Sequence, residues 1–174
     1  HLTYGTLSVK EIYKKIKDFK YKCEKQGLKY NKRGLSAFSS RLSWRCHFIQ
    51  KLEDQPSIEN KCMHSSYEGM REKKSNTDTL KAWETGFTGF PFVDACMRSL
   101  TYNGWITFRM RAMLTSFASY DLWIDWRESG YVLARLFTDY EPGIHYIQLQ
   151  MQSGVKGINT LRIYNHINQS IEND

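Results

Sequence analysis

The sequence has no long apolar run and no signal-peptide pattern. No stretch reaches the roughly 18 consecutive apolar residues that a membrane-spanning helix needs, so no membrane span is expected. GxSxG, P-loop and GxGxxG motifs are also missing. Their absence argues against hydrolase, nucleotide-phosphate and Rossmann-type chemistry.

Cysteine is sparse and irregularly placed. The four cysteines are Cys23, Cys46, Cys62 and Cys96, and they form no CxxC pair. We expect them to be reduced, in a cytosol-like compartment. A structural zinc site needs two close ligand pairs, and neither Cys46 with His47 nor Cys62 with His64 has the spacing of one. The sequence therefore predicts no metal site, and core cysteines with surface histidines are the favoured interpretation.

Strand-like alternation and internal repeats are absent too, which predicts an all-α fold. A chain of 174 residues with 41% apolar content can form one domain with a real core. The chain opens at His1 without a methionine and stops at Asp174 in the middle of a pattern. We therefore expect residues 1–174 to be a single domain that is incomplete at both ends.

Basic residues outnumber acidic ones, and the net charge of +7 favours a polyanionic partner. Much of the excess is local, because seven lysines crowd the first expected helix and its exit. They are Lys10, Lys14, Lys15, Lys17, Lys20, Lys22 and Lys25. A solvated lysine face and a nucleic-acid patch are both open interpretations of this cluster.

Capping signals and apolar periodicity predict four helices. Ser8 and Glu11 fit a capping box, Gly27 ends the first helix or the turn after it, and Pro91 suits the first turn of a later helix. Residues 55–79 are polar and lack a clear period, so we expect an irregular or short-helical surface connection. The expected helices run from Val9 to the low twenties, from Leu35 to Asp54, from Pro91 to Asn103 and from Trp105 to Tyr120, and a loop-rich tail follows.

The last of these helices carries two arginines in an otherwise apolar face. Arg109 and Arg111 are separated by about 200° of helical rotation, so at least one must find a partner in the interior. The nearest downstream anions are Asp139 and Glu141, in a segment, residues 139–143, whose proline and glycine are expected to end the preceding helix and expose a loop. Arginine, carboxylates and aromatic residues together suggest a site for an anionic aromatic ligand.

Several motifs follow one another along the chain in a specific order. They are SRLSWR (40–45), AW (82–83), GFPFVDACMR (89–98), GW (104–105), RMR (109–111), DWR (125–127) and RIYN (162–165). In order and spacing they resemble the photolyase/cryptochrome family over nearly the whole chain. The resemblance implies the helical FAD-binding domain of an atypical bacterial photolyase-like branch, in a bacterial cytoplasm.

The resemblance also implies parts that this chain does not contain. The family's α/β antenna domain and its phosphate-binding turn would both precede His1. Without the turn, whose charge-assisted contacts are worth roughly 1.5 to 3 kcal/mol each, we expect FAD binding by the chain alone to be weak or absent.

A set of flavin contacts is implied residue by residue. Arg111 would pair with Asp139 beside the flavin, Glu141 takes the place of a second aspartate, and His145 would face flavin N5, where a titratable imidazole could couple the redox state to pH. Trp105 would pack beneath the cofactor. The implied cofactor-binding residues are Phe38, Arg45, Trp105, Arg111, Asp139, Glu141 and His145.

The substrate side departs from the family pattern. The glutamate that holds a pyrimidine dimer in the family aligns with Arg41, and the asparagine of the family's Asn-Arg pair aligns with Phe108. Trp44 and Arg109 are kept from that group, and Gln169 would give a polar contact near the rim. Arg41, Trp44, Arg109 and Gln169 are therefore the expected contacts to damaged DNA.

The family's three-tryptophan electron chain is also incomplete here. Only Trp126, the middle member, is kept, with Leu149 at the proximal position and the distal position near Lys73. An isolated tryptophan is ordinarily core, so the resemblance alone gives Trp126 an electron-transfer role. Aromatic residues that could bridge the gap are Trp105, Trp123, Tyr140 and Tyr146.

The resemblance implies light-driven repair, in which reduced FAD donates an electron to a pyrimidine lesion. If active, the protein would be a deoxyribodipyrimidine photolyase-type lyase. The alternatives are a cryptochrome-like photoreceptor that signals to a partner protein, favoured by the changes at residues 41 and 108, and a helical remnant that binds nothing tightly.

Overall fold

The computed structural model describes residues 1–71, 76–157 and 163–172, and within these ranges the protein is all-α, as predicted. The α-helices are α1 (Val9–Gln26), α2 (Lys32–Asp54), α3 (Thr77–Thr85), α4 (Pro91–Asn103), α5 (Phe108–Ser116), α6 (Trp126–Leu136), α7 (Pro142–Gln152) and α8 (His166–Glu172). Two short 3-10 helices, η1 (Pro56–Glu59) and η2 (Ser65–Tyr67), and a π-helical turn, η3 (Phe117–Asp121), join them. Within the described ranges, no helix is both long and apolar enough to cross a membrane.

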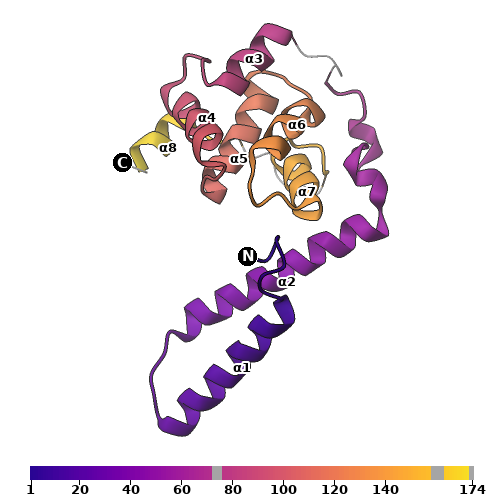
Figure 1. Ribbon diagram of the computed structural model, residues 1–174. Coiled ribbons are helices and arrows are strands. Elements are labelled where there is room, and N and C mark those ends of the chain that lie inside the picture. Colours follow the sequence, from indigo (N-terminus) through magenta and orange to yellow (C-terminus); the bar gives the residue numbers. More distant parts are fainter. Residues whose placement is uncertain (72–75, 158–162, 173–174) are drawn as a thin grey trace.

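The first two helices form an arm that extends from a compact group of the remaining helices (Figure 1). The capping box of α1 is present, since Ser8 Oγ accepts from the Glu11 amide while the Glu11 carboxylate accepts from the Ser8 amide. Gly27 ends α1 in the left-handed conformation with φ of 64°. Both signals were predicted from the sequence, so the boundaries of α1 follow from local chemistry.

The core lies among the helices beyond the arm. Trp83 of α3, Phe117 and Trp126 are almost completely buried, and Val93, Cys96, Met97 and Leu100 of α4 all point inward, as predicted. Since these side chains recur every three to four residues, each helix presents one apolar face to a shared centre. α8 packs against α4 at the outer side of this group.

Helix α2 joins the arm to the core by crossing α7 at close range. A Cβ on Gly143 would lie 2.7 Å from the Cα of Ile49, so the two backbones approach closely only because residue 143 is glycine. Ile49 and Arg45 are four residues apart and lie on the same face of α2. The crossing therefore brings Arg45 to the residues just before α7.

Four local predictions are corrected. The connection expected to be irregular or short-helical over residues 55–79 does contain η1 and η2, but α3, which was not predicted, already begins at Thr77. The helix expected from Trp105 begins only at Phe108 and passes into a π-helical turn at Phe117. Pro142 and Gly143 do not end a helix; Pro142 is the first residue of α7, where its missing N–H costs no hydrogen bond. The tail predicted to be loop-rich contains α8.

Candidate functional site

A cavity of about 140 Å³ lies among α5, α6, α7 and the link before α7. Its floor is mostly apolar, and its rim carries charged and polar groups. The lining residues are Phe108, Arg111, Ala112, Thr115, Leu133, Phe137, Asp139, Tyr140, Glu141, Ile144, His145, Gln148, Leu149 and Gln152. An apolar pocket with a few fixed polar groups is the usual form of a site for a planar organic ligand.

The expected pairing of Arg111 with Asp139 is present at one side of the cavity. Nη1 and Nη2 of Arg111 donate to Oδ1 and Oδ2 of Asp139 at 2.9 and 3.1 Å, and Nε donates to the Ile106 carbonyl at 2.9 Å. The guanidinium also lies 4.2 Å from the centre of the Phe137 ring. All three nitrogens of the Arg111 guanidinium donate a hydrogen bond, so the orientation of the group is fixed. The pair is not buried as expected, because the Asp139 side chain is 43% exposed.

A second ion pair joins the arm to the same cavity. Nη2 of Arg45 on α2 donates to Oε2 of Glu141 at 2.8 Å, and both side chains are about four-fifths buried. Glu141 immediately precedes α7 and lines the cavity. Glu141, whose side chain is longer than that of the aspartate implied at this position, therefore pairs with Arg45 of α2. This ion pair links the cavity rim to the arm.

His145 is buried between the cavity and α6, with only 7% of its surface exposed. Its Nε2 lies 3.0 Å from the Gly130 carbonyl, which can only accept, so in the neutral ring Nε2 carries the hydrogen and Nδ1 is an acceptor. Burial lowers the pKa of His145 to about 4, outweighing the effect of the Gly130 carbonyl. The imidazole is therefore neutral near physiological pH, and the coupling of the flavin redox state to His145 stays a prediction.

Three of the implied cofactor residues, Phe38, Arg45 and Trp105, are not among the lining residues of the cavity. Phe38 is exposed on α2. Trp105, 54% exposed, precedes α5, and its ring centre lies 5.9 Å from the Arg111 guanidinium. Trp105 therefore stands beside the ion pair at the rim and is not one of the cavity's lining residues.

The expected DNA contacts lie on different helices. Arg41 and Trp44 are exposed on α2, and Arg109 is exposed on α5 directly after the cavity-lining Phe108. Gln169 is on α8, the helix that packs against α4. Trp44 also lines a shallow groove between α1 and α2, together with Tyr13, Ser36, Ser39, Ser40, Ser43 and His47. The structure therefore brings Arg41 and Trp44 together on one helix and does not bring Gln169 to them.

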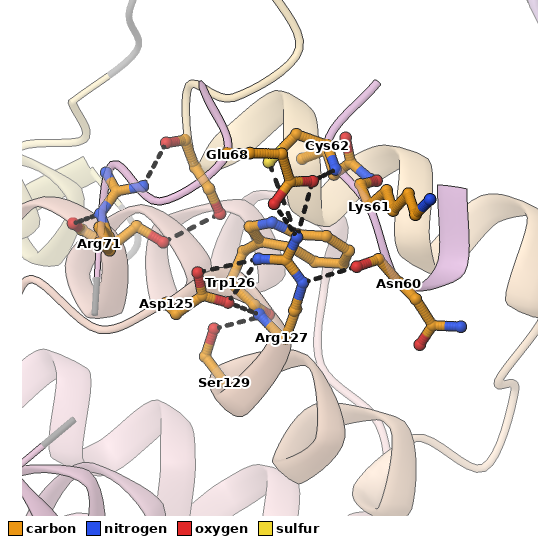
Figure 2. A network of polar contacts seen from close by, with 12 residues as sticks. Asn60, Lys61, Cys62, Glu68, Arg71, Asp125, Trp126, Arg127 and Ser129 are labelled. Carbon is orange, nitrogen blue, oxygen red and sulfur yellow. Dashed lines mark hydrogen bonds and ion pairs between the residues drawn. The ribbon is translucent and has the colours of Figure 1, made fainter. Parts of the chain in front are cut away.

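Trp126 lies in the core rather than in the cavity, and its ring lies beside a polar network that centres on Arg127 (Figure 2). The guanidinium of Arg127 stands 4.6 Å from the Trp126 ring centre and is held by Asp125, Glu68 and the Asn60 carbonyl. Burial raises the pKa of the neighbouring Cys62 thiol, so this thiol is not an activated nucleophile. Lys73, near the expected distal position, lies outside the described residues.

A line of hydroxyls beside the cavity was not anticipated as a unit. Tyr140, a lining residue, donates to the Tyr146 hydroxyl at 3.2 Å, and Tyr146 donates to Oε1 of Glu59 at 3.3 Å. Tyr140 and Tyr146 were expected only as bridging aromatics. Nothing in the sequence pairs residue 59 with residue 146, so only the folded chain identifies the carboxylate.

Metal ligands do not gather in this region. Among the residues that the structure describes, no group of three or more His, Cys, Asp and Glu side chains is arranged to hold a metal ion. His145, the histidine of the cavity, has its Nε2 on a backbone carbonyl.

Deoxyribodipyrimidine photo-lyases are among the known proteins with similar sequences. A deoxyribodipyrimidine photo-lyase from Streptomyces griseus is 33% identical over 155 residues, covering 88% of this chain and 31% of the relative. The corresponding protein of Escherichia coli is 38% identical over 96 residues, covering 53% of this chain and 20% of the relative. The chain thus spans less than a third of the length of these relatives.

Solved structures agree on the fold. A class III photolyase from Agrobacterium tumefaciens superposes with a TM-score of 0.74 at 28% identity, covering 83% of this chain and 30% of the other. A cryptochrome from Synechocystis superposes with a TM-score of 0.83 at 23% identity, covering 98% and 34%, which shows the shared fold alone. The family model described as the FAD binding domain of DNA photolyase matches residues 38–174. This chain therefore belongs to the family of photolyase FAD-binding domains, and its cofactor is FAD.

Proposed function

We propose that the cavity among α5, α6 and α7 receives the isoalloxazine ring of FAD. Its apolar floor suits the faces of a planar ring, and Ala112, Leu133 and Leu149 would exclude water from it. The acceptor Nδ1 of His145 and the two ion pairs at the rim suit the polar edge of the ring. The residues that would hold the cofactor are Arg45, Arg111, Asp139, Glu141 and His145.

We further propose that the protein to which this domain belongs repairs pyrimidine lesions in DNA with blue light. FAD supplies the light absorption and the electron. A lesion would be flipped from the duplex toward the cavity, and extrusion is least costly where damage has already weakened stacking. Arg109 would offer positive charge to the lesion or its phosphates, since it is exposed next to the cavity-lining Phe108.

The exposed residues of α2 would complete the DNA contact. Trp44 is half exposed and offers an aromatic face on which a base can stack, while Arg41 adds positive charge one turn earlier. The observation that carries the proposal is the apolar cavity with its two guanidinium–carboxylate pairs in a chain that matches the photolyase FAD-binding family.

The test is flavin retention followed by repair. The longer protein to which this domain belongs is loaded with FAD, separated from free flavin, and illuminated with blue light in the presence of oligonucleotides that carry one defined pyrimidine dimer, because the chain of residues 1–174 alone is expected to bind FAD poorly. We expect bound flavin and light-dependent loss of the dimer. Arg111→Ala should lose flavin, whereas Arg33→Ala, on the exposed start of α2, should retain it. Flavin binding that is equal in both variants would contradict the cavity assignment.

A photoreceptor without repair activity is the second candidate, and one observation favours it. Arg41 and Phe108 replace the glutamate and asparagine with which the family is expected to hold a dimer. In that case the bound flavin would change its absorbance under blue light while the dimer stays intact. Following flavin absorbance during the repair assay therefore separates the two functions.

A further inference from the structure

Two tyrosines and a carboxylate form a continuous hydrogen-bonded line from the cavity to the protein surface. Tyr140 lines the cavity, its hydroxyl donates to Tyr146, and the Tyr146 hydroxyl donates to Glu59, which is exposed at the end of η1. The rings of both tyrosines also contact His145 edge-on, with centroids 5.1 and 5.3 Å away. The line therefore starts at the proposed flavin site and ends at solvent.

The far end of this line is held in place by α7 itself. Gln150 is four residues after Tyr146 and lies on the same face of the helix. Its buried Nε2 donates to the carbonyls of Ile58 and Lys61, both at 2.9 Å, and its Oε1 accepts from the Met63 amide at 2.7 Å. These bonds fix η1 against α7 on both sides of Glu59. The carboxylate is thus positioned by the fold.

Such a line has the parts that tyrosine oxidation requires. A phenol that loses an electron becomes a strong acid, so a proton acceptor must stand within hydrogen-bond reach. Burial, together with Tyr140 and the Glu59 carboxylate, raises the pKa of Tyr146, so its hydroxyl keeps its proton until an electron is removed. Glu59 is the acceptor at the end of the line.

We propose that Tyr140, Tyr146 and Glu59 form a proton-coupled electron-transfer relay that donates one electron to a photoexcited flavin in the cavity. Tyr140 loses one electron and its phenolic proton. The proton passes to the oxygen of Tyr146, which releases its own proton to Oε1 of Glu59. The products on the protein are a neutral tyrosyl radical at residue 140 and a protonated Glu59. This inference rests on the proposed flavin site.

The tryptophans near this region are expected to be poorer electron donors than the tyrosines, because a cation lies close to each ring. Arg127 stands 4.6 Å from the Trp126 ring centre, Arg71 stands 4.8 Å from that of Trp123, and Arg111 stands 5.9 Å from that of Trp105 at the cavity rim. A fixed cation over a ring disfavours the radical cation that forms when the ring loses an electron. Leu149, at the cavity wall, has no oxidisable ring. The tyrosines therefore offer the favoured route.

The first experiment tests the line in the flavin-free chain. Tyrosines labelled with ¹³C at Cζ are observed by NMR, and Glu59→Gln should shift the Tyr146 and Tyr140 signals while leaving the other tyrosines unchanged. Glu24→Gln, on the exposed face of α1, is the matched control and should shift neither. Unchanged Tyr146 and Tyr140 signals in Glu59→Gln would show that the two hydroxyls are not hydrogen-bonded in series to Glu59, and would overturn the relay.

The second experiment tests the relay in the FAD-loaded longer protein by transient absorption and electron paramagnetic resonance after a blue flash. We expect a tyrosyl radical that is lost in Tyr140→Phe and retained in Tyr131→Phe, an exposed tyrosine of α6. Glu59→Gln should slow its formation by roughly 100-fold, the typical contribution of a positioned proton acceptor. Deuterated water should slow the formation of the tyrosyl radical in the parent protein, because the step moves protons.

The outcomes separate the two proposals. A longer protein that takes up no flavin overturns the proposed function and removes the relay's electron acceptor. Bound flavin with a tryptophan radical, or with a tyrosyl radical that forms at the parental rate in Glu59→Gln, overturns the relay and leaves the flavin site standing.

Discussion

At the scale of single residues, the Arg111–Asp139 pair determines how strongly the cavity rim is held. The bidentate contact is well formed, but the carboxylate is 43% exposed, so solvent screens part of the attraction. We expect Arg111→Ala to lower the free energy of unfolding by about 1 to 2 kcal/mol, below the roughly 3 to 5 kcal/mol of a fully buried pair. Urea denaturation measures this. Arg111→Lys keeps the charge but not the fork, and stability equal to the parent in this variant would show that the bidentate geometry contributes nothing.

A second residue-scale prediction concerns His145. Its pKa is about 4 in the folded protein and near 6.5 when unfolded, so between these values the unfolded chain binds more protons. Stability is therefore full above about pH 6.5 and falls as the pH drops toward 4, by up to about 3 kcal/mol. Denaturation at pH 7.5 and pH 5 should show the loss, and His145→Gln should show less of it. An equal loss in both proteins would assign the pH dependence to other groups.

At the scale of helices, the crossing of α2 and α7 should depend on Gly143. An alanine there would place Cβ 2.7 Å from the Ile49 Cα, and backbone cannot move aside without shifting a helix. We expect Gly143→Ala to cost roughly 1 to 3 kcal/mol and to weaken the Arg45–Glu141 contact.

Gly130 gives a matched control for this prediction. It is also a buried helical glycine, but its added Cβ would meet the end of the Leu149 side chain at 2.6 Å, which can change rotamer. Thermal unfolding should therefore rank Gly143→Ala as the more damaging. The reverse order would mean that the helix crossing is looser than the structure indicates.

The helices whose ends carry strong local signals could be predicted from the sequence. Ser8 and Gly27 bound α1, and Pro91 starts α4, as predicted. Helix α3 was not predicted, because it has only nine residues and a single fully buried side chain, Trp83, which are too few for a clear apolar period. Pro142 was misread because a proline can follow one helix or begin the next, and only packing against α2 decides.

The candidate site, too, could be predicted from the sequence only in part. The pairing of Arg111 with Asp139 was anticipated because the two residues have close family counterparts. The relay was not, because Glu59 reaches Tyr146 only through the amide contacts of Gln150 with η1. Long-range proximity of this kind leaves no period or spacing in the sequence.

At the scale of the whole molecule, the lysine-rich arm can be tested as a nucleic-acid surface. Tyr13 of α1 lines the groove that contains Trp44, and Lys10 and Lys17 lie three and four residues from Tyr13, on the same helical face. Lys15 and Lys22 lie about 200° and 180° away from it. These four lysines of α1 are thus divided between a groove face and an opposite face.

If the groove face contacts phosphates, neutralising it should reduce the salt dependence of DNA binding. We expect Lys10→Gln with Lys17→Gln to reduce the slope of log affinity against log salt by about 2, since each lost phosphate contact changes the slope by about 1. The control, Lys15→Gln with Lys22→Gln, has the same net charge and should change it little. Because phosphate contacts do not distinguish sequences, affinity for damaged and undamaged duplex should fall together, whereas Trp44→Ala should affect mainly the damaged duplex. Equal slopes in the two lysine variants would show that the lysines of α1 form a solvated face that only contributes to net charge.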